Sequence, residues 1–139
     1  MAAFNKFNAF VADVANKVHN LGSDTLKVML TNTAPTATNA IKTDISEITA
    51  GSGYAAGGGQ ATQISSAQSS GTYKLLLNNV TFTASGGSVG PFRYCVLYNS
   101  TPGSGNLIGY YDYGTSLTVT SGNSFQVQFD AVNGVLQLA

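Results

Sequence analysis

The sequence predicts a mainly β protein, an antiparallel sandwich or barrel preceded by one amphipathic α-helix. After residue 60, short segments of alternating apolar and polar residues are separated by glycine, proline and asparagine, a spacing typical of all-β folds. In the first 20 residues, apolar side chains instead recur every three or four positions, as on one face of a helix. With 139 residues, 43% of them hydrophobic, the chain can bury the core of a single domain over residues 1–139.

The helix is predicted over residues 3–20 and the β-sandwich over residues 26–139. Gly22 is suited to end the helix, and His19 is expected to lie at the helix end rather than to bind a ligand, since it is the only histidine. The predicted helical face consists of Phe4, Phe7, Val11, Val14 and Val18.

The first strand is predicted at residues 26–30, where five residues are mostly apolar. Residues 31–43 are expected to form a long loop, followed by one helical turn over residues 44–48 that Thr43 caps. The glycine-rich stretch at residues 51–59 is expected to be irregular.

Two strand pairs follow from the alternation of apolar residues. A two-residue turn at Asn78–Asn79 would place Leu77 opposite Val80 and all apolar groups on one face; a crossover between two sheets at that corner is the alternative. If residues 117–121 and 125–129 are neighbours, a three-residue loop best matches their apolar positions.

The third pair is the most specific, since residues 92–98 and 107–113 flank a loop with one proline and two glycines. Pairing Tyr98 with Leu107 places Arg93 opposite Asp112 and predicts a structural ion pair between them. The opposite face is also apolar, so this hairpin is expected to be central or covered. The same register predicts one aromatic face made of Phe92, Tyr94, Tyr98, Tyr111 and Tyr113.

Charge is scarce, and this limits the chemistry that the chain can perform. Only 9% of residues are charged, whereas a typical soluble domain carries about 25% charged residues. The six acidic residues are spread over separate elements, and no two have a spacing that predicts a paired-carboxylate or calcium site. We therefore expect no catalytic residue, no metal site and no cofactor, and we predict that the protein is not an enzyme. Six scattered basic residues give no basic patch, so nucleic acid is not expected as a partner.

Membrane insertion and disulfide formation are not expected either. No apolar run reaches the length of about 18 residues that a transmembrane helix needs. Polar residues interrupt the N-terminal stretch where a secretory signal would lie. The one cysteine, Cys95, lies in an apolar strand and is expected to be a buried, inert thiol. Neutral polarity replaces charge, with 14 Ser, 15 Thr, 12 Asn and 6 Gln. Such a surface gives little repulsion between copies and suits an assembled protein.

Several structural segments together have a familiar pattern. They are the amphipathic start, Leu26-Lys27-Val28-Met29-Leu30-Thr31-Asn32, Val80-Thr81-Phe82-Thr83-Ala84-Ser85-Gly86-Gly87, Gly90-Pro91-Phe92-Arg93-Tyr94-Cys95-Val96-Leu97-Tyr98-Asn99, and Leu107-Ile108-Gly109-Tyr110-Tyr111-Asp112-Tyr113-Gly114. In these segments the chain resembles small structural proteins of tailed bacteriophages, and capsid decoration, or cement, proteins most closely.

The resemblance implies a jelly-roll-like sandwich that sits as a homotrimer on the virion, at the capsid surface, after synthesis in the host cytoplasm. Its partner would be the major capsid protein, contacted through residues 31–43, 51–60 or 99–106, or through the helix. The alternative is a tail or fibre domain that binds host surface glycans through its tyrosines, and an enzyme would require two carboxylates close together in a cleft. The predicted interface residues are Phe4, Phe7, Tyr94, Tyr111 and Tyr113.

Overall fold

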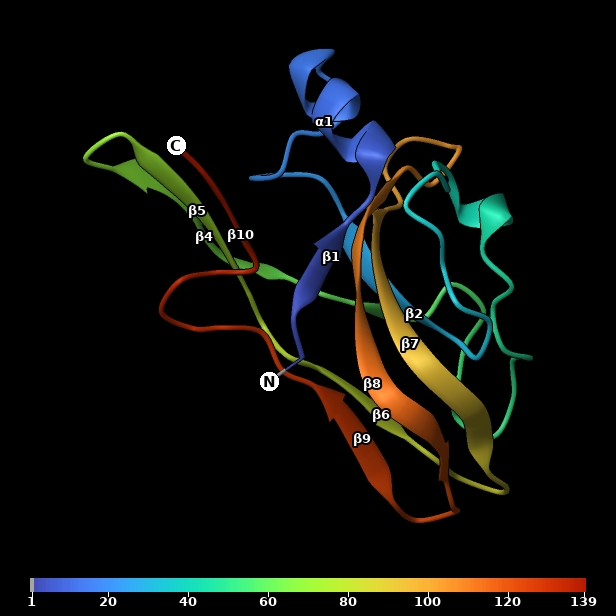
Figure 1. The fold of residues 1–139 in the computed structure, drawn as a ribbon. Helices are drawn as coiled ribbons and strands as arrows, with labels where there is room; N and C mark the ends of the chain where they lie inside the picture. Colours follow the sequence, from blue (N-terminus) through green and yellow to red (C-terminus); the bar gives the residue numbers. More distant parts are fainter. Residues whose placement is uncertain (1) are drawn as a thin grey trace.

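A computed structural model describes residues 2–139 and shows an antiparallel β-sandwich with one short helix near the N-terminus (Figure 1). The strands form a five-stranded sheet in the order β1-β8-β7-β2-β3, a three-stranded sheet β10-β5-β4 and a two-stranded sheet β6-β9. The mainly β class that the sequence predicts is thus confirmed. The strands are β1 (Phe4–Lys6), β2 (Leu26–Thr31), β3 (Gly59–Gln60), β4 (Gln63–Ser69), β5 (Thr72–Leu77), β6 (Val80–Thr83), β7 (Val89–Asn99), β8 (Leu107–Val119), β9 (Ser124–Val127) and β10 (Leu136–Leu138).

The main core lies between the five-stranded sheet and the two smaller sheets. Apolar residues of β2, β7 and β8 face those of β5, β6 and β9, and the rings of Phe92 and Phe125 meet edge to face across the core, with centroids 4.9 Å apart. Alternation explains this placement, since Val80 and Phe82 are buried while Thr81 and Thr83 are exposed.

The five-stranded sheet is covered on its other face as well. Met29, Val96, Tyr98 and Leu107 form a second buried cluster there, and Ile45 packs on it from the loop after β2. Strand β2 is therefore apolar almost throughout, as expected for a strand buried on both faces. This loop contains a short 3₁₀ helix, η1 (Lys42–Asp44). It begins two residues before the helical turn predicted over residues 44–48.

The helix α1 (Asn8–Ala15) is shorter than the predicted helix over residues 3–20. The chain before it forms β1, in which Phe4 pairs with Tyr111 of β8, and Lys17 ends the helix region with a φ of +64°. The predicted apolar face was also wrong, because Phe10 is buried and Val11 is 57% exposed. A spacing of three between apolar residues fits a strand followed by a helix as well as one continuous helix.

The β7–β8 hairpin forms as predicted at its loop end but shifts register further along. Tyr98 pairs with Leu107, and a bulge between Leu97 and Tyr98 then places Tyr94, not Arg93, opposite Asp112. An extra residue on one strand exchanges the faces of all residues that follow it. A second irregularity, between Phe92 and Tyr94, separates Phe92 from Tyr98 on the same strand. The single aromatic face was therefore wrong: Phe92 and Tyr111 lie in the main core, and Tyr98 lies in the second cluster on the other face.

The two other predicted hairpins do not form. Strand β5 pairs with β4 and β10, and β6 pairs with β9, so the chain crosses between sheets at Asn78–Asn79, which was the alternative. Residues 117–119 continue β8 and pair with β7. The chain then turns at residues 120–123 and crosses to the other layer, where β9 pairs with β6. In both cases the inward-facing residues are those predicted, while the strand partners differ.

The β4–β5 hairpin extends away from the body, with β10 beside it (Figure 1). Residues 66–71 at its tip are all exposed and none carries a charge. This arm and α1 are the two elements that project most clearly from the sandwich.

Candidate interaction surface

The structure does not bring the five predicted interface residues together. Phe7 is fully buried in the second core cluster, and Tyr111 is 9% exposed in the main core. Phe4 and Tyr94 are half-buried, and only Tyr113 has a largely accessible ring, at 51% exposure. Phe7 is therefore part of the core of this chain rather than of its surface.

Tyr113 borders a pocket of about 430 Å³ beside β9. Its ring stands edge-on to Phe125, with centroids 5.6 Å apart, and Tyr111 and Cys95 line the same pocket. Burial is the main cause that raises the pKa values of Tyr111 and Cys95 to about 12, so both groups are neutral near pH 7 and the thiol is unreactive. Gln126 and Gln128 add neutral amides at the rim. The pocket thus combines aromatic rings with uncharged hydrogen-bonding groups.

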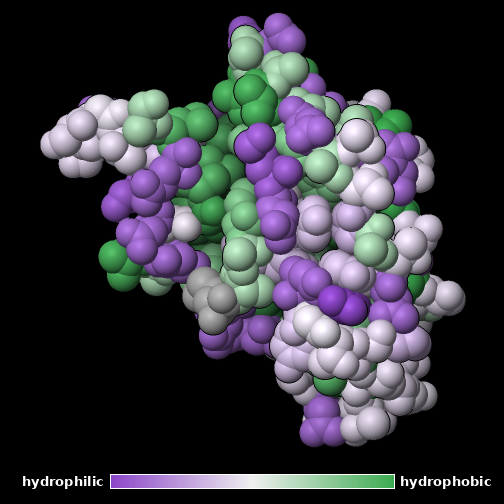
Figure 2. Space-filling model, in the orientation of Figure 1, coloured by the Kyte–Doolittle hydropathy of each residue, from purple (hydrophilic) through white to green (hydrophobic). Residues whose placement is uncertain are grey.

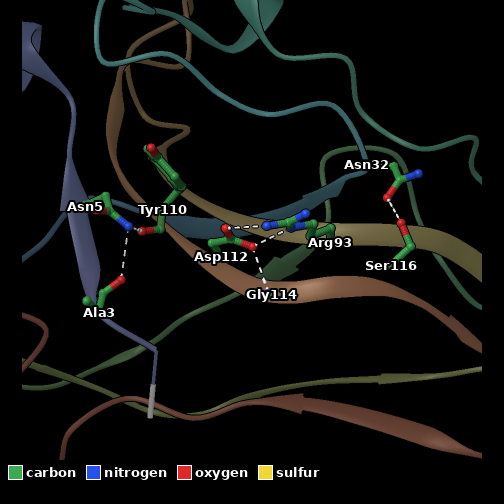
Figure 3. Close-up of polar contacts among 8 residues, drawn as sticks. All are labelled: Ala3, Asn5, Asn32, Arg93, Tyr110, Asp112, Gly114 and Ser116. Carbon is green, nitrogen blue, oxygen red and sulfur yellow. Dashed lines mark hydrogen bonds and ion pairs between the residues drawn. The ribbon is translucent and has the colours of Figure 1, made fainter.

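The predicted ion pair between Arg93 and Asp112 is present. The Arg93 Nε and Nη2 atoms donate to the two carboxylate oxygens at 2.7 and 3.0 Å, and Gly114 N–H donates to the same carboxylate at 2.8 Å (Figure 3). These hydrogen bonds lower the pKa of Asp112 and raise that of Arg93. The pair is bidentate and more than a third exposed. It links β7 to β8 at a second irregularity of the ladder, between Phe92 and Tyr94, and is a structural contact of small energetic weight.

Hydrophobic side chains gather in a hollow between α1 and the sheet that contains β10 (Figure 2). This α1–β10 groove has a volume of about 490 Å³. Val11 and Leu138, which line it, are 57% and 43% exposed. Its two side walls, β1 and β10, each pair with only one strand among the described residues. The groove is lined by Phe4, Lys6, Phe10, Val11, Val14, Ala15, Leu136, Gln137 and Leu138.

His19 is buried after the end of α1 and belongs to a polar network rather than to a helix cap. Asn99, which is fully buried, accepts a hydrogen bond from Thr101 N–H at 3.0 Å and donates to the Asp24 carboxylate at 2.6 Å. The Asn99 amide is thereby oriented so that its nitrogen faces His19 Nδ1 at 3.0 Å. Nδ1 must accept, so the proton of neutral His19 lies on Nε2, which has no hydrogen-bond partner among the described residues and lies 3.8 Å from Asp13 Oδ2.

This network makes stability depend on pH below the ordinary pKa of histidine, about 6.5. Burial lowers the pKa of His19, although Asp13 and Asp24 oppose that effect, so the unfolded chain binds the proton more readily than the folded chain. Stability is therefore complete above the unfolded pKa of about 6.5 and falls as the pH drops through it. We expect the urea midpoint to decrease from pH 7 to pH 5 in the wild type and to change much less in His19→Gln.

The matched measurement is the same urea titration at pH 4 and below. The pKa values of Asp44, Asp112 and Asp130 are lowered by hydrogen bonds, so their contributions are lost only at more acid pH, in wild type and variant alike. An equal decrease of the two midpoints between pH 7 and pH 5 would contradict the assignment to His19.

The described residues contain no group of three or more His, Cys, Asp and Glu side chains arranged to hold a metal ion. No helix within residues 2–139 has the length and apolar character to span a membrane. Comparisons with protein-family models, curated proteins and solved structures found no match to this chain. The function is therefore argued from the surface itself.

The α1–β10 groove and the His19 network were both missed by the sequence reasoning. Each is built from residues more than 70 positions apart, such as Val11 with Leu138 and His19 with Asn99. Alternation of apolar residues indicates which side chains point inward, but it carries no information on which distant segments meet. The only available signal was the rarity of histidine in a chain with so few ionisable groups.

Proposed function

We propose that this protein is a structural component of a tailed-bacteriophage virion, a decoration protein that binds the major capsid protein and stabilises the head. The observation that carries the proposal is the α1–β10 groove, an apolar recess on a surface of mostly neutral residues. Contact through such a surface needs no chemistry and little charge, and about 800 Å² per partner is enough for a specific complex.

The projecting β4–β5 arm supports the same role. Its uncharged tip can reach a neighbouring subunit while the body contacts another. A homotrimer, as the resemblance implies, would multiply weak contacts by avidity. In this proposal the protein works at the capsid surface, bridging subunits and resisting expansion of the head.

The test uses empty heads assembled from the major capsid protein that the proposal requires, sought among the products of the same genome. We expect the purified protein to co-sediment with the heads and to raise their melting temperature. Val11→Asp should weaken binding about tenfold or more, because a carboxylate in an apolar contact is strongly unfavourable. Val132→Asp is the matched control, since Val132 is 76% exposed and lies outside the groove. Absence of both binding and stabilisation would refute the proposal.

A second candidate is a tail or fibre domain that binds host glycans, favoured by the pocket at Tyr113. An exposed aromatic ring next to neutral amides suits stacking on sugar rings, which carry no charge. A glycan array on the isolated protein distinguishes the two candidates. Hits that disappear in Tyr113→Ala would favour the glycan-binding domain, whereas a decoration protein should give none.

A further inference from the structure

Two lysines from different elements converge on one buried tyrosine. Lys27 of β2 lies directly opposite Tyr98 of β7 in the sheet, so the two side chains share a face. Lys42 of η1 approaches the same ring, with Nζ 5.6 Å from the ring centroid. Both lysines and Tyr98 line a pocket of about 190 Å³, here called the Tyr98 pocket, together with Gly57, Ser100 and Gly105.

The walls of the Tyr98 pocket are held in place by hydrogen bonds. Tyr98 is 2% exposed, and its hydroxyl donates to the Gly57 carbonyl oxygen at 2.6 Å. The Gly57 N–H in turn donates to Glu47 Oε1 at 2.6 Å. The Tyr98 and Gly57 walls of the pocket are therefore preorganised, whereas the two lysine side chains that line it are long and flexible.

Glycines provide the space that the Lys42 side chain occupies. A Cβ at Gly105 would lie 2.7 Å from Lys42 Cβ, and a Cβ at Gly57 would lie 3.4 Å from Lys42 Nζ. A larger residue at position 105 would displace Lys42 from its place over the Tyr98 ring. Glycine at positions 57 and 105 thus leaves room for the Lys42 side chain and its ammonium group beside the Tyr98 ring.

The positive charge in the pocket is not neutralised by an ion pair. Neither Lys27 nor Lys42 has a carboxylate within 4.0 Å among residues 2–139, where the ion pairs are those of His19 and Arg93. The two neighbouring carboxylates are hydrogen-bonded to other groups: Glu47 accepts from Tyr54 Oη and from the Gly57 N–H in the pocket wall, and Asp44 accepts from the N–H groups of Ala40 and Ile41. Two half-buried lysine residues that line one cavity, neither of them in an ion pair among residues 2–139, favour an anion there.

We propose that the Tyr98 pocket binds a carboxylate, supplied by a glutamate or aspartate side chain of a partner protein. The cavity accommodates a carboxylate with its methylene groups, and two ammonium groups can each donate to one of its oxygens. Two cations are too few for the backbone of a nucleic acid, which requires an extended basic surface. The proposal rests on this geometry alone and does not depend on the virion role.

The experiment is an NMR titration of the full chain with N-acetyl-glutamate α-amide, which carries one carboxylate, and with the neutral glutamine analogue at equal ionic strength. We expect saturable shifts of the amide signals of Gly57 and Gly105 with the glutamate probe only, with a Kd on the order of 10 mM. Lys27→Gln/Lys42→Gln should weaken binding at least about tenfold. Lys17→Gln/Lys74→Gln, which removes the same charge elsewhere, should not.

Three outcomes would overturn the proposal. They are the absence of saturable shifts, equal weakening by the two double variants, and tighter binding of inorganic phosphate than of the carboxylate probe, which would indicate a phosphate site. The single variant Lys27→Gln provides a second test if the double variant is poorly folded. No capsid protein is present in this experiment, so its failure would leave the head-binding test unaffected.

Discussion

Gly58→Ala is expected to lower the free energy of unfolding by about 2–5 kcal/mol, from the combined cost of left-handed backbone and forced overpacking. Gly58 has a φ of +79°, and a Cβ there would overlap the Val28 carbonyl oxygen and lie 2.9 Å from Met29 Cα. These are backbone atoms of β2, which is paired on both sides. They cannot move aside without disturbing the five-stranded sheet.

Gly86→Ala is the matched control. Gly86 has a φ of +73°, nearly that of Gly58, but a Cβ there would meet nothing within 4 Å. It should therefore show only the conformational cost of about 1–2 kcal/mol. Urea unfolding of both variants, followed by far-UV circular dichroism, gives the comparison. Equal losses would mean that the close approach to β2 contributes nothing.

Phe92→Ala is expected to cost about 4 kcal/mol, within the range for deleting a buried phenylalanine ring. Phe92 is fully buried, and its ring packs on Phe125 of the opposite layer with a centroid distance of 4.9 Å. The variant would leave a cavity where the β7–β8 hairpin meets β9. Thermal and urea unfolding should both show the loss.

Tyr113→Ala tests whether burial, rather than contact with Phe125, sets the loss of unfolding free energy expected for Phe92→Ala. The Tyr113 ring also packs on Phe125, at 5.6 Å, but Tyr113 is 51% exposed. Its loss should be about 1 kcal/mol, because only part of its apolar surface leaves water on folding. A loss as large as that of Phe92→Ala would show that the aromatic contact itself dominates.

The ion pair illustrates how far register could be predicted from the sequence. Tyr98 and Leu107 were paired correctly, but the bulge after them places Tyr94 opposite Asp112. Arg93 still reaches Asp112, because it lies at a second irregularity of the ladder, between Phe92 and Tyr94, where strict alternation of faces does not hold. The bulge between Leu97 and Tyr98 shifts the pairing by one residue, so Tyr94 and Tyr111 lie on opposite faces instead of sharing one.

The helix shows the converse case, in which the local pattern is ambiguous. Phe4 and Phe7 fit a helical spacing, yet Phe4 lies in β1, where Gly109 of β8 leaves room for its ring; a Cβ at Gly109 would overlap that ring. Local preference is weak compared with such a long-range contact. Pairing with a strand more than 100 residues away therefore favours a strand over a helix at residues 4–6.

The sequence by itself determined the mainly β class, the inward-facing apolar residues of the strands, the inert buried cysteine and the neutral surface, since these depend on composition and on local periodicity. Only the tertiary structure decided which strands pair, where Phe7 lies, and which side chains form the α1–β10 groove, the His19 network and the Tyr98 pocket. The physical reason is that alternation of apolar and polar residues orients each side chain inward or outward. The choice of partner depends on the packing of segments far apart in the chain, which no local pattern encodes.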